Sequence, residues 1–283
     1  MKRKALILFA VTVLFVSCVY TERFDTERAR YLGESGDIVV TLNVAEAEEC
    51  GAAALLPQSD IVKRVDRISL SLKSSGEGAF GITGIANGLL SSTEVGTVLI
   101  WDPGFVRAGE SPRYYENRKM ALKTGSLSDG IVLFTTENYK AEYDRLKGSG
   151  NAYIPLHLWN AMESSLAALY VENPENIMVP GVDIPQETLQ KIKSVLLFLD
   201  DADSSFSLSG EIQMHDEDGA RTLCTLLRNL LVQKIRREGG KLDVRALSGI
   251  FTYDGSLLRI SGYSVSYDEV RMLLTKEFEN ASI

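Results

Sequence analysis

The sequence predicts a mixed α/β fold of the α+β type, in which antiparallel sheets are covered by amphipathic helices in α/β/α layers. Apolar and polar side chains alternate over residues 65–72 and 192–199, as expected of half-buried strands. A polar turn and a second alternating segment follow each of them, at residues 80–84 and 206–210, which is typical of a β-hairpin. The two hairpins align with one gap, so the sequence predicts a duplicated α-β-β-α-β-β-α unit.

The other elements are expected in the same order in both halves. Helical stretches should precede the hairpins and close each half, at residues 45–65, 159–193, 137–147 and 266–278. Asp129-Gly130 and Asp254-Gly255 are favourable hairpin turns. They predict two further strand pairs, residues 113–123 with 131–135 and residues 248–253 with 257–263.

The first 18 residues have the features of a lipoprotein signal. Three cations, Lys2, Arg3 and Lys4, are followed by an apolar run over residues 5–16. This run is too short to cross a bilayer core, which needs about 20 residues. Cleavage after Ser17 would leave Cys18 as an N-terminus that carries acyl chains on diacylglycerol, so the protein would be anchored to a membrane. An ordinary cleaved signal with an incidental cysteine is the alternative.

Composition and charge indicate an exported globular body with an acidic surface. The chain is 45% hydrophobic and 24% charged, and loss of the three N-terminal cations would shift its formal charge from −8 to about −11. Such acidity argues against nucleic acid as a partner and against electrostatic capture by anionic lipid. We expect a signal over residues 1–17, a lipid-anchored tether over residues 18–36, and half-repeats over residues 37–147 and 148–283 within one compact body.

The two remaining cysteines, Cys50 and Cys224, leave two possibilities open. An exported pair can form a disulfide, but both residues also lie in helical patterns as small apolar side chains. The sequence has no CxxC motif and no Cys/His cluster, so neither a zinc site nor another cofactor is expected.

Two apolar stripes at helical spacing are the candidate lipid-facing or membrane-facing surfaces. Each stripe either covers a sheet, forms a movable wall over an apolar cavity, or lies in a bilayer interface, and the pattern alone leaves these alternatives open. The stripe of the expected helix at residues 216–237 consists of Leu223, Leu226, Leu227, Leu230 and Leu231. The other stripe consists of Trp159, Met162, Leu166, Leu169 and Tyr170.

Motifs that would indicate an enzyme are missing from the sequence. Residues 76–81 spell GxGxxG, but they lie between two expected strands and not before a helix, so a hairpin turn is the better interpretation. Asp200, Asp201 and Asp203 lack the EF-hand spacing and are expected in a solvated turn. His157 and His215 fit no HExxH motif, and the chain has no GxSxG. We therefore expect a protein that is not an enzyme.

Several short segments, in their order and spacing, resemble the treponemal family of concealed outer-membrane lipoproteins. They are Asp37-Ile-Val-Val-Thr-Leu, Ile61-Val-Lys-Arg-Val-Asp-Arg, Tyr114-Tyr-Glu, Ala168-Leu-Tyr-Val and Asp254-Gly-Ser-Leu-Leu-Arg-Ile. The resemblance covers roughly residues 37–278. It implies an α/β/α fold, an acyl anchor at Cys18, a helix-lined apolar cavity, and amphipathic helices that insert into the inner leaflet of the outer membrane. It also implies similarity in fold to mycobacterial lipoproteins that carry glycolipids. This chain is more acidic than the family pattern.

Two hypotheses of function follow. The first is an anchored periplasmic lipoprotein of the outer membrane that binds or transfers an acyl chain or glycolipid in an apolar cavity, or perturbs the leaflet through its helices. The second is a non-catalytic anchored scaffold that binds a periplasmic or outer-membrane protein through a sheet edge or a helix face. A cavity of several hundred Å³ lined by the helices would favour the first.

Overall fold

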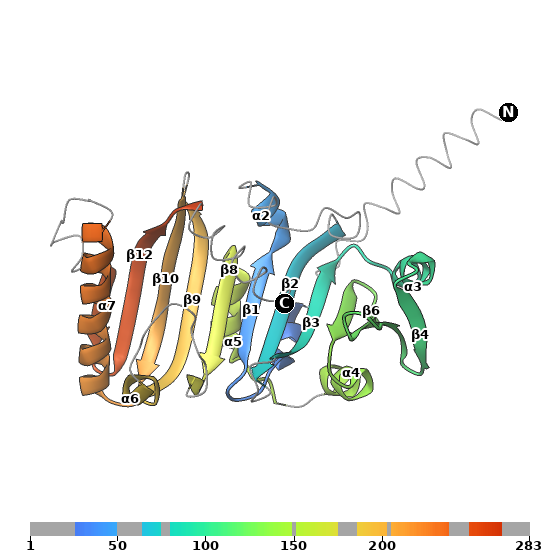
Figure 1. Cartoon of the computed structure of the whole chain (residues 1–283), viewed down its shortest axis with the longest axis horizontal. Coiled ribbons are helices and arrows are strands. Elements are labelled where there is room, and N and C mark those ends of the chain that lie inside the picture. Colours follow the sequence, from blue (N-terminus) through green and yellow to red (C-terminus); the bar gives the residue numbers. More distant parts are fainter. Residues whose placement is uncertain are drawn as a thin grey trace.

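The strands of this chain form one continuous antiparallel sheet (Figure 1). The computed structural model describes residues 26–49, 64–74, 80–148, 151–174, 186–202, 205–237 and 249–267. Within these ranges the sheet has twelve strands in the order β11-β12-β10-β9-β8-β1-β2-β3-β7-β6-β5-β4. They are β1 Ile38–Asn43, β2 Val65–Ser74, β3 Phe80–Gly88, β4 Phe105–Glu110, β5 Arg113–Asn117, β6 Leu122–Ser128, β7 Ile131–Thr135, β8 Ala167–Glu172, β9 Ile192–Ala202, β10 Ser205–Met214, β11 Phe251–Asp254 and β12 Leu257–Val265. The expected mixed α+β fold is confirmed.

The sheet is built outward from a central pair, β1 and β8. From β1 outward come β2, β3, β7 and β6, and from β8 outward come β9, β10, β12 and β11. The two sides therefore place their hairpins in the same order. The first side continues with the β4–β5 hairpin at its outer end. The duplication of the sequence remains a prediction, with which this order agrees.

Helices pack on both faces of the sheet, because successive side chains of each strand point to opposite faces. Val39, Ile85 and Leu133 belong to a buried cluster with η1, α4 and α5 on one face. Leu42, Ile68 and Val132, which point the other way, pack with α2 and α3, and α7 covers the outer strands on that second face. The described helices are η1 Thr26–Tyr31, α2 Val44–Glu49, α3 Ser92–Trp101, α4 Tyr139–Lys147, α5 Leu156–Glu163, α6 Gln186–Leu189 and α7 Glu217–Arg237.

The expected helical stretch over residues 159–193 is wrong in its middle. α5 ends at Glu163, and Ser164 and Ser165 both donate their hydroxyls to the carbonyl of Ala161 at the helix end. The chain then forms β8, which pairs with both β1 and β9. Ala168 and Tyr170 are buried on one face while Leu169 points to the other. This alternation overrode the helical spacing that the sequence suggested.

Two other expectations need correction. Residues 113–123 are not one strand, because Asn117 ends β5 and its Oδ1 accepts from the backbone of Lys119 and Met120 in a turn before β6. The folded body also begins earlier than residue 37. Ala29 and Leu32 are fully buried, so the described part of the expected tether packs into the core.

Some expectations fall on residues that the structure does not describe. Cys18, Cys50, the loop at residues 75–79 and the greater part of the last expected helix lie outside the described residues. Cys224 is a free, buried cysteine whose Sγ lies 3.5 Å from the carbonyl oxygen of Phe251.

Candidate lipid-contact surface

The leucine stripe of α7 faces the sheet. Leu223 and Leu231 are buried in a cluster with Ile212, Phe251 and Leu258. Leu226 and Leu227 are partly buried and pack against the same cluster. Leu230, at 40% exposure, lies on the solvent side. Four of these five leucines therefore contribute to packing between α7 and the sheet.

The second stripe is divided between two faces of the sheet. Trp159 and Met162 of α5 are fully buried in the cluster on the first face. Leu166 is buried in a different cluster with Ala47 and Phe206. Leu169 lies in β8 and is partly buried. The five residues proposed from the sequence do not form one surface.

Large apolar side chains are exposed instead at the C-terminal end of α3. Trp101 is 81% exposed, Ile100 64% and Val98 42%, and Glu94 is the single charged residue of the helix. Val95 and Leu99 form the sheet-facing side of α3. Val95 packs against the cluster on the second face of the sheet, and Leu99 is buried. The last turn of this helix is thus apolar on its solvent side as well.

Met120 belongs to the same end of the molecule. It lies in the turn between β5 and β6 and is 58% exposed. The side chain of Asn117 accepts a hydrogen bond from the backbone of Met120 and so fixes this turn. Asn117 also pairs with Phe105, the first residue after the turn that follows α3. A Cβ placed on Gly104 would lie 3.3 Å from the Asn117 Nδ2 atom, so the two turns are in contact. We call Val98, Ile100, Trp101 and Met120 the apolar tip.

The base of α3 is fixed by hydrogen bonds to two carboxylates. Ser91 and Glu94 form a capping box, in which each side chain accepts from the backbone of the other residue. Asp129 accepts from the hydroxyl of Ser92 at 2.6 Å and from its backbone nitrogen at 2.9 Å. The Ser91 bonds lower the pKa of Glu94, and the Ser92 bonds lower the pKa of Asp129. The helix therefore starts from a rigid corner of the sheet and presents its apolar end outward.

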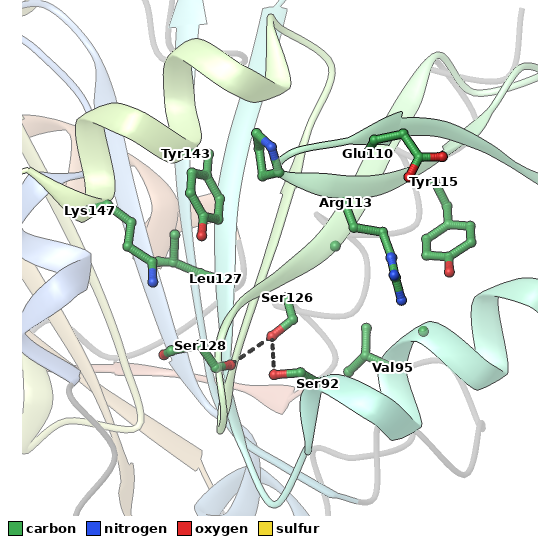
Figure 2. A pocket seen from close by; sticks show the side chains of 13 residues that line it. Ser92, Val95, Glu110, Arg113, Tyr115, Ser126, Leu127, Ser128, Tyr143 and Lys147 are labelled. Atoms are coloured by element: carbon green, nitrogen blue, oxygen red, sulfur yellow. Dashed lines mark hydrogen bonds between the residues drawn. The ribbon is translucent and has the colours of Figure 1, made fainter.

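A hollow lies beside the base of α3, at an interruption in the sheet. β5 pairs with β6 only at Tyr115, Glu116 and Asn117, whereas β6 continues along β7 to Ser128. Residues 125–128 therefore lack a strand on one side. α3, α4 and the β4–β5 hairpin surround this gap and leave a space of about 470 Å³, shown in Figure 2. We call this space the notch.

The notch is mainly polar, and its position differs from that expected of a lipid cavity. α5 and α7, whose stripes were the candidates, do not line it. Gly125 borders it at a point where a Cβ would come within 2.7 Å of the Arg113 carbonyl oxygen. Arg113 and Lys147 contribute its positive charges. No group of three His, Cys, Asp or Glu side chains in the described ranges is arranged to hold a metal ion.

The apolar tip does not follow from the sequence pattern, because its segment of α3 forms no amphipathic stripe. Residues 95–101 read Val-Gly-Thr-Val-Leu-Ile-Trp and contain no charge. A short helix that is apolar on all sides gives no stripe. An uncharged apolar run that ends in Trp, next to the turn Asp102-Pro103-Gly104, was the available signal. Among the described residues no helix is both long enough and apolar enough to span a membrane.

Comparison with known proteins connects this fold to a treponemal protein. Three crystal forms of TP0453 match the chain. Form IV has a TM-score of 0.60 at 12% identity and covers 87% of this chain and 95% of its own. Form III has 0.60 at 12%, covering 88% and 97%, and form I has 0.59 at 12%, covering 88% and 96%. No family model and no curated protein sequence matches. The chain shares the fold of TP0453.

Proposed function

We propose that this chain is an exported, acylated lipoprotein on the periplasmic leaflet of the outer membrane, and that it acts on lipid without being an enzyme. Cys18 carries the acyl anchor, and the apolar tip of α3 contacts the leaflet. The observation that supports lipid contact is the exposure of Trp101 and Ile100 at the end of a helix with one charge. Tryptophan is enriched at membrane interfaces because its ring is apolar and its N–H is polar.

The size of the apolar tip suits reversible contact with a leaflet. Burying a large apolar side chain completely is worth about 1.5–3 kcal/mol, so four partly exposed ones contribute on the order of 4 kcal/mol. This free energy corresponds to a dissociation constant of about 1 mM. Such a tip is too weak to attach a protein alone, but it adds a second contact to an acyl anchor. Arg118 and Lys119 precede Met120 in the same turn and are exposed, which suits phosphate groups at the membrane surface.

A flotation assay tests this proposal. The unacylated mature chain, residues 18–283 with Cys18→Ser, is mixed with phosphatidylcholine vesicles at about 1–10 mM lipid, the range set by the estimated affinity. The unaltered surface should float with the vesicles, and the double variant Ile100→Ser, Trp101→Ser should float at least about fivefold less. Leu156→Ser is the matched control, because it removes an exposed leucine from α5. Equal flotation of all three proteins would overturn the proposal.

A second candidate function is an anchored scaffold that binds a protein by adding a strand to the sheet. The observation in its favour is β4, a strand at the edge of the sheet in which four of the six residues from Phe105 to Glu110 are exposed. An unpaired edge offers backbone donors and acceptors to an extended segment of a partner. If the chain is a scaffold of this kind, the Ile100→Ser, Trp101→Ser variant should still bind its protein partner. If the apolar tip contacts lipid, the same variant should lose its binding to vesicles.

A further inference from the structure

We infer that the notch is a binding site for a hydroxylated organic phosphate, such as a phosphoglycerol or sugar phosphate group. Its polar lining and open mouth distinguish it from an acyl-chain cavity. Figure 2 shows Arg113 and Tyr115 entering from the β4–β5 hairpin, Ser92 and Val95 from α3, and Tyr143 and Lys147 from α4. The volume of about 470 Å³ exceeds what an inorganic phosphate fills and suits a small polyol phosphate.

The charge of the notch favours an anion. Arg113 makes no ion pair or side-chain hydrogen bond to another described residue, and it is exposed at the start of β5. The Nζ atom of Lys147 lies 5.5 Å from the centre of the Tyr143 ring and has no carboxylate partner among the described residues. Glu110 is the acidic residue of the lining, and its Oε2 is 2.7 Å from an Arg107 nitrogen. Two exposed cations that face one space without acidic partners give that space a local positive charge, which attracts anions.

The hydroxyl groups of the notch favour a ligand that itself donates hydrogen bonds. Ser92 donates its proton to Asp129, at 2.6 Å. Ser126 lies 2.8 Å from the Ser128 carbonyl oxygen and 3.0 Å from the Ser92 Oγ, and it has one proton to give to either. Both serines therefore use their protons inside the protein and keep lone pairs to accept from a ligand. Arginine and lysine would bind the phosphate, and the serines would accept from the hydroxyls.

The remaining walls can hold a compact carbon skeleton. Tyr115, Tyr143 and Pro112 line the space together with Leu127 and Val95. Aromatic and aliphatic side chains of this kind pack against the C–H faces of a glycerol or sugar. The pattern of cations, acceptor hydroxyls and apolar walls is therefore complementary to one class of molecule, in which phosphate and hydroxyl groups occur together.

The same phosphate chemistry has two possible sources, a soluble metabolite and a phospholipid headgroup. α3 has ten residues and is about 15 Å long, and it joins the notch at its base to the apolar tip at its end. A leaflet in contact with the tip would bring headgroups close to the notch. The lipid source rests on the proposed function, whereas binding of a soluble phosphate does not.

The first arm of the test uses soluble probes on the unacylated mature chain. Glycerol 3-phosphate is titrated by calorimetry or NMR at low salt, with glycerol as the uncharged comparison. Saturable binding of glycerol 3-phosphate is expected, and Arg113→Ala and Lys147→Ala should each weaken it about fivefold, since each removes one charge-assisted contact. Lys140→Ala is the matched control, because it removes an exposed cation from the same helix as Lys147 but outside the notch.

The second arm uses vesicles and separates the two sources. Vesicles of phosphatidylglycerol are compared with vesicles of phosphatidylcholine. A headgroup source predicts that Arg113→Ala reduces the preference for phosphatidylglycerol about fivefold while binding to phosphatidylcholine is unchanged. Binding of glycerol 3-phosphate with no such preference identifies a soluble phosphate. The inference is overturned if neither probe depends on Arg113 or Lys147. Loss of flotation in Ile100→Ser, Trp101→Ser tests the proposed function separately.

Discussion

The two tryptophans of the chain, Trp101 and Trp159, occupy opposite environments. Trp159 is fully buried in the cluster between α5 and the sheet, and Trp101 is 81% exposed at the end of α3. One residue therefore serves the core, and the other is available to a partner. The sequence made Trp159 a candidate for lipid contact, whereas the structure offers Trp101 for that role.

This contrast predicts a simple fluorescence signature. Emission of the unaltered protein should contain a quenchable component from Trp101, and Trp101→Phe should leave only emission from a buried indole at shorter wavelength. Acrylamide quenching checks this directly. On addition of vesicles the Trp101 component should shift to shorter wavelength, because the indole moves into an apolar medium. A Trp101→Phe protein that still shifts with vesicles would place lipid contact elsewhere.

Substitutions of the α7 leucines should lower the free energy of unfolding by amounts that follow the burial of each side chain. Leu223→Ala removes a side chain from the cluster with Phe251 and Leu258 and should lower the free energy of unfolding by about 2–5 kcal/mol. Leu230→Ala changes a residue on the solvent side and should cost less than about 1 kcal/mol. Urea denaturation followed by circular dichroism measures both. A similar cost for the two variants would mean that α7 does not pack on the sheet as described.

The alternation of apolar and polar residues in strands, together with turn residues, predicts much of the fold. Where the prediction is wrong, the reason is physical. Residues 65–72 and 192–199 alternate, and both lie in hairpins that agree with expectation. Residues 167–172 also alternate, but Leu166 and Tyr170 are four residues apart, a spacing that fits a helix as well. Only pairing of β8 with β1 and β9, which are distant in sequence, decides between the two.

The candidate site could be predicted less well than the fold. The leucines of α7 form a clear stripe, and such a stripe is most often the side that a helix buries. The apolar tip combines α3 with the turn around Asn117, and the notch depends on where β5 stops pairing with β6. Neither relationship follows from local pattern, because both depend on how the β4–β5 hairpin is placed beside α3.

Low pH should weaken the hydrogen bonds that hold the N-terminal end of α3, because their acceptors are the carboxylates of Glu94 and Asp129. Hydrogen bonds from Ser91 and then Arg64 hold the pKa of Glu94 below its ordinary value of 4.5, and those from Ser92 hold the pKa of Asp129 below 3.8. A carboxyl whose pKa is lowered by folding stabilises the native state above its unfolded pKa, and this contribution is lost as the pH falls through the folded pKa. Asp129→Asn should therefore lower Tm at about pH 6, and the difference from the unaltered protein should shrink below roughly pH 3.8.

Serine 92 supplies the control for this pH effect. Ser92→Ala removes the hydroxyl that donates to the Asp129 carboxylate. The hydrogen bond from the backbone nitrogen of residue 92 to Asp129, at 2.9 Å, remains. The pKa of Asp129 in the folded protein should then move back toward its ordinary value, so the loss of Tm that Asp129 causes on acidification should be smaller and should be complete at a higher pH. A Tm difference between Asp129→Asn and the unaltered protein that stays constant from neutral to acid pH would contradict a role for the ionised carboxylate.

Cys224 should be protected from thiol reagents as long as α7 stays on the sheet. Its side chain is buried beside Phe251, and burial raises the pKa of the thiol, so little reactive thiolate forms. With Cys18 and Cys50 replaced by serine, Cys224 is the single thiol of the mature chain. Labelling with a maleimide should be roughly 10²-fold slower in the native protein than in denaturant, because it requires local opening. Rapid labelling of the native protein would show that α7 separates from β11 readily, as expected if α7 were a movable wall.

A second labelling experiment tests whether Cys50 and Cys224 form a disulfide. The protein with only Cys18 replaced is labelled in denaturant without a reducing agent, and two reactive thiols are expected because Cys224 is free.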